Sequence, residues 1–462
     1  MTPEARLSRP VALLVAGTFF MENLDGTIIS TAAPAMARSL GVMSSDIGVC
    51  VTAYLLTLAV LIPVSGHVAD RWGARRTFLA AIVVFTAASA LCAASTNLTE
   101  LLVMRVLQAV GGAMMVPVGR LVVLRTTSKQ EMITAIAYLT WPALVAPIVA
   151  PMLGGLLVSY ASWHWIFLLN VPLGVMAVVV GARVMPRLPG VACPPFDTWG
   201  ALLSAATLGC LVYAATLVGA QRVPWSIVAL FVAACCGAAV VAVRHLRRTA
   251  HPLLDLGALN IQTFRVSHAG GSLFRMAVNA VPFLLPLMFQ DRFGWSPVKA
   301  GAMVLFVFIG NLGIKPLTTP MLRRFGFRTV LIWATSAAVI CIAACGVLTV
   351  TTPLAITAVV VLLGGVFRSI GFTVYNTIAF ADVDQSDMSR ANTLAGTIQQ
   401  LAQGLGVAVG VLALQAGVHT VGTSDSYPFA FVAVALLIVV AVIEAVRLPH
   451  SAGESIGGGA AR

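Results

Sequence analysis

The chain has 462 residues, of which 59% are hydrophobic and only 10% are charged. Soluble globular proteins average about 45–50% apolar and about 25% charged residues, so this composition excludes a soluble core with a wetted surface. The formal net charge of +12 fits a membrane protein that gathers Lys and Arg in cytoplasmic loops, and no basic run is interleaved with aromatics as a nucleic-acid patch would be. We therefore expect an all-α integral membrane protein that binds no nucleic acid.

Fourteen apolar runs are long enough to cross a bilayer, which takes about 20 mainly apolar residues in a helix. In chain order they cover 11–34, 47–66, 77–95, 100–124, 133–159, 164–185, 198–217, 225–243, 266–290, 299–318, 328–349, 353–378, 391–417 and 427–447. The first run resembles a signal peptide, but it is followed by further spans and is better explained as an uncleaved helix. We predict a six-helix half at 11–185, two extra linking helices at 198–243 and a second six-helix half at 266–447.

Basic residues predict the orientation of these spans. With the N-terminus inside, the inner loops and tails hold 19 Lys and Arg residues and the outer loops hold 4. Because positive charge marks cytoplasmic loops, both termini are predicted to be cytoplasmic, with the protein in a bacterial cytoplasmic (inner) membrane. The longest loop is about 244–265, so any function must reside in the helix bundle.

The stretch GHVADRWGARR at 66–76 holds one acid and three arginines in a chain that otherwise avoids charge. Gly66 and Gly73 allow close backbone approach and a tight turn. Asp70 can pair with an arginine or with a helix N-terminus. We interpret the stretch as a short cytoplasmic loop whose contacts hold that side closed; the alternative is a loop that only sets topology.

A second, degenerate copy of this stretch lies at 320–331, PMLRRFGFRTVL. Placing Gly73 on Gly326 puts Arg75 on Arg328, whereas the acid is replaced by Arg323. Arg105 in the fourth run has a counterpart in Arg368 in the twelfth. The sequence separation between Gly73 and Gly326 is similar to that between Arg105 and Arg368. This similarity indicates duplicated halves, which are typical of alternating-access transporters. Chance likeness between basic loops is the alternative.

Glu22 and Asp25 are the acids that lie deep in an apolar run, and their spacing places them on one helix face. At about 1.5 Å per residue, Asp25 and Arg105 lie about 9 Å and about 8 Å from the outer edge, so they can pair if their helices adjoin. Glu22 has no obvious basic partner and is the better candidate to bind a proton. A static salt bridge is the alternative for Asp25 and Arg105.

Other polar residues within the runs are candidates for lining a cavity. Arg275 could balance the acids of the first run or bind an anionic substrate, or it could simply cap a loose helix start. Arg368 is a candidate for the role of Arg105 in the second half. The remaining candidates are amides, each of which could instead bond neighbouring helices: Asn23, Gln108, Asn311, Asn376 and Gln399.

GHVADRWGARR resembles the G-x-L-A-D-R-x-G-R-K/R motif between helices 2 and 3 of the major facilitator superfamily. The matching residues are Gly66, Asp70, Arg71, Gly73, Arg75 and Arg76. Four further segments resemble the fourteen-helix drug:proton antiporter branch: LDGTIISTAAP (24–34), RVLQAVGGAMMVP (105–117), APIVAPMLGG (146–155) and WHWIFLLNVPLG (163–174). The third of these departs from the antiporter motif G-x-x-x-G-P-x-x-G-G at two glycines; its positions here are Ala146, Pro147, Ala150, Pro151, Gly154 and Gly155. Small residues keep their spacing there, so close helix packing is still expected.

The resemblance implies a multidrug exporter that couples efflux of lipophilic or cationic compounds to proton entry by alternating access. It implies a monomer in the bilayer whose partners are protons and a small-molecule substrate, with the proton gradient in place of a cofactor. Exporters of one specific metabolite, including an anionic one, are the alternative. The scattered cysteines lack metal-ligand spacing, and no G-x-S-x-G or phosphate-cradling motif occurs, so we expect neither a metal site nor an enzyme. Asp25→Asn is expected to abolish coupled transport while leaving the protein in the membrane.

Overall fold

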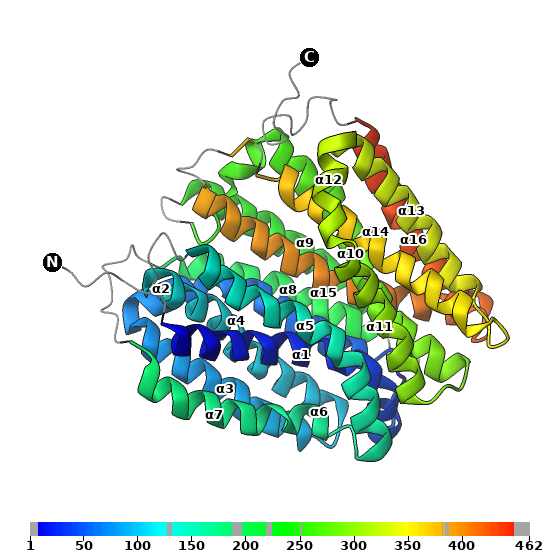
Figure 1. Cartoon of the computed structure of the whole chain (residues 1–462), viewed down its shortest axis with the longest axis horizontal. Coiled ribbons are helices and arrows are strands. Elements are labelled where there is room, and N and C mark those ends of the chain that lie inside the picture. The colour runs from blue at the N-terminus through cyan, green and yellow to red at the C-terminus, as the bar shows by residue number, and fades with distance from the viewer. Residues whose placement is uncertain are drawn as a thin grey trace. The chain divides into compact units, whose positions relative to one another are not determined.

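A computed structural model describes residues 8–126, 132–186, 196–218, 224–249, 252–380, 382–383 and 388–447. The chain there is helical, with one short 3-10 helix η1 and one π-helical turn η2 (Figure 1). The bounds are α1 Arg9–Leu40, α2 Ile47–Trp72, α3 Ala74–Ala93, α4 Leu98–Thr126, α5 Met132–Tyr160, α6 Trp165–Leu168, α7 Asn170–Val184, α8 Thr198–Val218, α9 Trp225–Arg248, η1 Leu256–Asn260, α10 Gln262–Leu287, η2 Met288–Arg292, α11 Pro297–Gly313, α12 Lys315–Phe325, α13 Phe327–Val347, α14 Leu354–Ile378, α15 Met388–Val421 and α16 Ser426–Arg447.

Every predicted apolar run coincides with helix, but two runs are interrupted. The run 164–185 is divided into α6 and α7 at Leu169, and the run 299–318 is divided into α11 and α12 at Ile314. Pro172 and Pro316 each follow the break by two or three residues. Because a proline ring clashes with the carbonyl four residues earlier and removes a backbone donor, each break lies where a proline weakens the helix, although α1, α2 and α5 contain prolines without a break.

Twelve helices of the described part are long and apolar enough to cross a membrane. Two shorter apolar helices, Val145–Tyr160 within α5 and Thr198–Leu211 within α8, do not reach that length. The chain is therefore a multi-pass, all-helical membrane protein, while the count of fourteen spans stays a prediction.

The prediction of a loop at 66–76 was wrong for all but one residue. Helix α2 continues to Trp72 and α3 begins at Ala74, so Gly73 alone separates them, at φ 86°. Gly326 takes the same place between α12 and α13, at φ 74°. Positive φ is accessible to glycine without strain, so a one-residue turn between two helices needs glycine at both positions.

The helices form two compact units. Unit 1 contains the chain as far as Cys210 together with Ala234–Leu253, and unit 2 contains Leu211–Ala233 together with the chain from Leu254 onward. The predicted halves 11–185 and 266–447 each fall within one unit, whereas the predicted linking helices 198–243 are divided between the two units.

Each unit packs its helices in the same pattern, as expected for duplicated halves. In unit 1, α1 packs against α5, α2 and α3 pack against α4, and α3 packs against α7. In unit 2, α10 packs against α15, α11 and α13 pack against α14, and α13 packs against α16. The aligned arginines of the two copies, Arg75 and Arg328, also make similar contacts. Arg75 donates to the Ala182 carbonyl in α7, and Arg328 donates to the Val446 carbonyl in α16 at 2.7 Å.

One end of α8 is tied to α9 by a buried carboxylate. Asp197, just before α8, accepts from the Gly200 and Leu253 amides at 2.8 and 3.0 Å and lies 2.7 Å from His245 Nε2 of α9. Burial would raise the pKa of Asp197, but the hydrogen bonds from His245, Gly200 and Leu253 hold it below its ordinary value. The contacts with His245 and Leu253 anchor the start of α8 to the end of α9 and to the segment that follows it.

Replacing Gly365 by alanine is expected to destabilise unit 2 by about 1–3 kcal/mol, because overpacking forces the backbone apart. A Cβ on Gly365 of α14 would overlap the Val307 carbonyl of α11. Thermal unfolding of the purified protein would measure the loss. Gly396→Ala in α15 is the matched control, because a Cβ there meets nothing within 4 Å and alanine favours helix. Equal unfolding temperatures for the two variants would contradict the packing argument.

Candidate functional site

A buried polar network lies inside unit 1, centred on Asp25 of α1. Asp25 Oδ2 accepts from Arg105 Nη1 of α4 at 2.6 Å. Asp25 Oδ1 accepts from Gln108 Nε2 at 2.9 Å and from Asn170 Nδ2 of α7 at 2.7 Å. Gln108 Nε2 also donates to Ser89 Oγ of α3 at 2.6 Å. Three helices thus meet at one carboxylate whose two oxygens are both occupied, and a fourth, α3, joins the network through Ser89.

The network is closed off from its surroundings. Asp25, Arg105, Gln108 and Asn170 are each 1% exposed or less. The guanidinium of Arg105 lies over the ring of Tyr54, 4.1 Å from its centroid, so an aromatic face covers the cation. The expected contact between Asp25 and Arg105 is present. Because a buried charge is tolerated only when it is paired and hydrogen-bonded, this arrangement stabilises the unit and holds Asp25 in one position.

Small residues of α5 set the position of α1 and hence of Asp25. Ala146 and Ala150 are fully buried, and a Cβ on Gly154 would stand 2.9 Å from Ile28 Cγ1 and 3.1 Å from the Ile28 carbonyl. The three residues recur every fourth position, so they form one face against α1. Helix α5 therefore packs closely against α1 although alanine stands at two glycine positions of the antiporter motif. Pro147 and Pro151 lie on the same helix, as does Gly155, which is buried.

Glu22 lies one turn before Asp25 and is only partly buried. Among the residues that the structure describes, no group forms a hydrogen bond or ion pair with its carboxylate. A Cβ on Gly112 of α4 would stand 3.5 Å from Glu22 Oε1 and 3.2 Å from the Tyr54 hydroxyl. The two side chains therefore flank one small space, and the Tyr54 hydroxyl is itself buried without a partner in the described part.

Arg275 forms a second polar cluster inside unit 2. This residue of α10 is 1% exposed and donates to Asn376 Oδ1 of α14 at 2.8 Å and to the Ser267 carbonyl at 3.1 Å. Two residues predicted separately, Arg275 and Asn376, are thus brought together. The ion pairs of the described part include no carboxylate for Arg275.

Arg368 of α14 donates from Nη2 to Asn279 Oδ1 of α10 at 2.9 Å. Since α14 and α10 take the places of α4 and α1 in the repeated packing, this contact is the counterpart of Arg105 with Asp25. The second unit therefore keeps the arginine but has a neutral amide where the first has an acid.

The remaining predicted residues lie outside these clusters. Gly66, Arg71 and Arg76 are exposed at the junction of α2 and α3, and Asp70 is partly buried there. The Asn23 amide donates to the Phe19 carbonyl of its own helix at 2.8 Å. Asn311 and Gln399 are partly buried on α11 and α15. The side chain of Arg323 lies outside what the structure describes.

Residues of these sites that were not singled out from the sequence include Tyr54, Asn170, Ser89 and Glu444. Asn170 belonged to the quoted segment WHWIFLLNVPLG, so a signal for it was present. Ser89 and Glu444 carried no signal, because a serine in an apolar run and an acid near the end of a span are both common. Glu444 of α16 lies against Gly270 of α10, where a Cβ would overlap its carboxylate, and its Oε2 atom is buried with no partner in the described ranges.

Duplicated helical units with ionisable side chains buried inside them define the class of secondary transporters. The family model for the Major Facilitator Superfamily matches residues 15–407 and 268–457. The chain belongs to the major facilitator superfamily.

Relatives and a solved structure agree with this family. The chain is 35% identical over 455 residues to "Putative multidrug resistance protein MdtD" of Escherichia fergusonii, covering 96% of this chain and 95% of that protein. It is 35% identical over 452 residues to the protein of the same name from Cronobacter sakazakii, with the same coverage. A POT family transporter solved with 5-aminolevulinic acid superposes with a TM-score of 0.69, over 97% of each chain and at 13% identity, which shows a shared fold.

Proposed function

We propose that this protein exports lipophilic, often cationic compounds in exchange for protons, by alternating access. The proposal is supported by membership of the major facilitator superfamily and by the solved transporter with the same fold. It is also supported by relatives that are named putative multidrug resistance proteins. The basic residues favour a bacterial cytoplasmic membrane with both termini inside. We expect a monomer that uses the proton gradient and no bound cofactor or metal.

The observation that carries the proposal is the contrast between Glu22 and Asp25. Both oxygens of Asp25 already accept hydrogen bonds, one of them from a paired arginine. Protonating Asp25 would leave Arg105 buried without a counter-charge, which is costly. Glu22 has no such partner in the described part of the chain. We therefore assign proton exchange to Glu22 and the positioning of α1 to Asp25.

Exchange follows from competition at one carboxylate. A proton neutralises Glu22, and a cationic substrate does the same by binding beside it, so the two exclude one another. The Tyr54 hydroxyl, on the same small space, is placed to hydrogen-bond the carboxyl or a polar group of the substrate. Alternating access then carries the proton inward and the substrate outward.

Substrate-induced proton release tests the proposal. Detergent-purified protein is mixed with a panel of cationic dyes in weak buffer, and a pH indicator follows the released protons. Wild type is expected to release protons, and Glu22→Gln is expected to release none. Asn23→Ala is the matched control on the same helix, because the Asn23 side chain bonds only to its own helix. Release that persists in Glu22→Gln would contradict the assignment.

A transporter for one specific anionic metabolite is the second candidate. Arg275 and Arg368 favour it, because neither has a carboxylate partner among the described residues. This alternative predicts protection against a single compound and loss of its transport in Arg275→Gln. Resistance to several unrelated cations in cells that express the protein would exclude it.

Asp70→Asn is expected to slow turnover more than it weakens substrate affinity. A carboxylate at the end of α2, beside the one-residue turn at Gly73, is suited to a contact that breaks during each transport cycle. Transport rates across a range of substrate concentrations, with binding measured on the purified protein, would separate the two effects. An affinity loss with unchanged maximal rate would contradict the gating role.

A further inference from the structure

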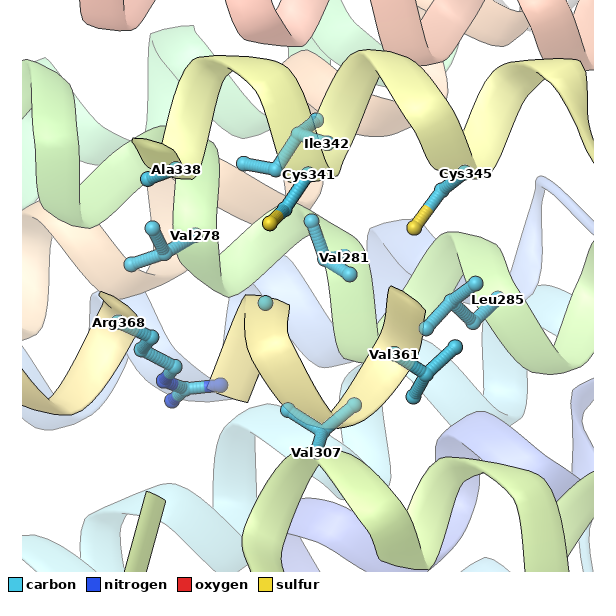
Figure 2. A pocket seen from close by; sticks show the side chains of 11 residues that line it. Val278, Val281, Leu285, Val307, Ala338, Cys341, Ile342, Cys345, Val361 and Arg368 are labelled. Atoms are coloured by element: carbon cyan, nitrogen blue, oxygen red, sulfur yellow. The ribbon is translucent and has the colours of Figure 1, made fainter. Parts of the chain in front are cut away.

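A small cavity lies within unit 2 between α10, α11, α13 and α14. Eleven residues line it, and Arg368 is the one that carries a charge. Figure 2 shows its guanidinium at one end of the cavity, with Leu285 and Cys345 toward the other end. The free volume is about 20 Å³, enough for one water molecule or one particle of similar size.

The guanidinium at this cavity has unused donors. Arg368 donates from Nη2 to Asn279, but its Nε and Nη1 atoms are buried and have no partner within the described ranges. The nearest compensation comes from aromatic rings, since Phe372 and Phe308 have centroids 5.5 and 5.9 Å from the guanidinium carbon. Both distances are at the outer limit of a useful cation–π contact, so the charge is only weakly compensated.

The first unit shows what is missing here. At the corresponding position of unit 1, Arg105 also leaves two donors, Nε and Nη2, buried without a partner in the described part, but it has Asp25 at 2.6 Å and the ring of Tyr54 at 4.1 Å. In unit 2 the acid is replaced by Asn279, whose amide donates to the Arg275 carbonyl at 2.8 Å. No ion pair within the described part includes Arg368. The repeat has thus kept an arginine that is partly buried, with its Nε and Nη1 atoms buried, and has lost its counter-charge.

Guanidinium donors that are buried without a partner or a counter-charge are unfavourable, and an arginine does not escape by losing its proton. We infer that the counter-charge comes from outside the described part of unit 2. It must be small, because the cavity holds one particle, and a single negative charge suffices for a single arginine. Apolar walls around the rest of the cavity disfavour a strongly hydrated or multivalent ion.

We propose that the cavity beside Arg368 binds one small monovalent anion of the halide type, chloride under ordinary conditions. The ion accepts hydrogen bonds from Nε and Nη1 of Arg368 and contacts the apolar side chains of α10 and α13. It does in unit 2 what the Asp25 carboxylate does in unit 1. This site is separate from Glu22, the residue to which we assign proton exchange.

Chloride binding and its effect on stability test the proposal. Purified protein is equilibrated with radiolabelled chloride, and its thermal unfolding is compared in sodium chloride and sodium gluconate at equal ionic strength. We expect retention of one chloride per chain that bromide displaces. We also expect an unfolding temperature higher by roughly 2–4 °C in chloride, as ligand binding to the folded state requires.

Three variants assign the effect to this cavity. Arg368→Gln is expected to lose both binding and the chloride-dependent rise, because the donors are gone. Asn279→Asp is expected to lose them because an internal carboxylate replaces the ion. Arg324→Gln is the matched control, since it removes an equal charge from an exposed position of α12 and should respond like wild type.

Two results would overturn the proposal. Wild type that retains no labelled chloride and unfolds at one temperature in both salts would mean that the cavity holds water only. Retention of chloride by Arg368→Gln, or its loss in Arg324→Gln, would place the anion elsewhere. Because binding to wild type is measured directly, the proposal can be overturned even if one of the variants fails to fold.

Discussion

Vesicles that contain Glu22→Gln are expected to accumulate no cationic substrate when a proton gradient is imposed. Glutamine keeps the size of the side chain but cannot exchange a proton or neutralise a cation, so both halves of the exchange fail. Uptake of a fluorescent cation into inverted vesicles, with acid inside, is the measurement. The expected signal equals that of vesicles without the protein.

Two variants make this result specific. Glu22→Asp keeps a carboxylate and is expected to retain part of the uptake, while Asn23→Ala is expected to retain most of it, because Asn23 bonds only within α1. Normal accumulation by Glu22→Gln would move the coupling role to another group. Glu444 would then be examined first, since its Oε2 atom is buried without a partner in the described part.

Breaking the Asp25–Arg105 pair is expected to have the largest effect on stability. Either Asp25→Asn or Arg105→Met leaves one buried charge without its partner, which costs about 3–5 kcal/mol. For a unit of this size that corresponds to a fall of roughly 6–20 °C in unfolding temperature. Thermal unfolding of the purified variants in detergent measures it.

Comparing the stability of a double variant with that of the single variants tests whether Asp25 and Arg105 act as a structural pair. Asp25→Asn combined with Arg105→Met removes both charges, so its loss of stability is expected to be smaller than the sum of the single losses. Glu22→Gln is expected to unfold at nearly the wild-type temperature, because Glu22 has no ion-pair partner in the described ranges. Strict additivity at Asp25 and Arg105 would mean that the pair contributes little.

The apolar runs predicted the helices because twenty apolar residues in a row have few alternatives in a bilayer. The predicted runs agree closely with the observed helices, with two exceptions. Helix breaks precede Pro172 and Pro316, and the predicted loop at 66–76 is helical as far as Trp72. The failure at 66–76 has a clear cause. Charge density was interpreted as loop, but arginine and aspartate at the end of an apolar helix can extend it into the interface, and only Gly73 requires a turn.

Contact between Asp25 and Arg105 could be predicted from the sequence because depth in the membrane is a one-dimensional quantity that residue counting supplies. The participation of Ser89 and Asn170 could not, since it depends on the rotation of α3 and α7 about their axes. Likewise, the similar spacing of the two motif copies and of Arg105 and Arg368 indicated a repeat. Only the packing of α14 on α10 showed that Arg368 contacts Asn279.

The sequence by itself determined the class of this protein, its helices and the few ionisable residues worth examining, because hydrophobicity and charge act locally along the chain. Only the tertiary structure decided which of the two acids of α1 is saturated and which is unpartnered in the described part. That distinction depends on donors from α4 and α7, which are far away in the sequence and meet Asp25 only after the helices pack.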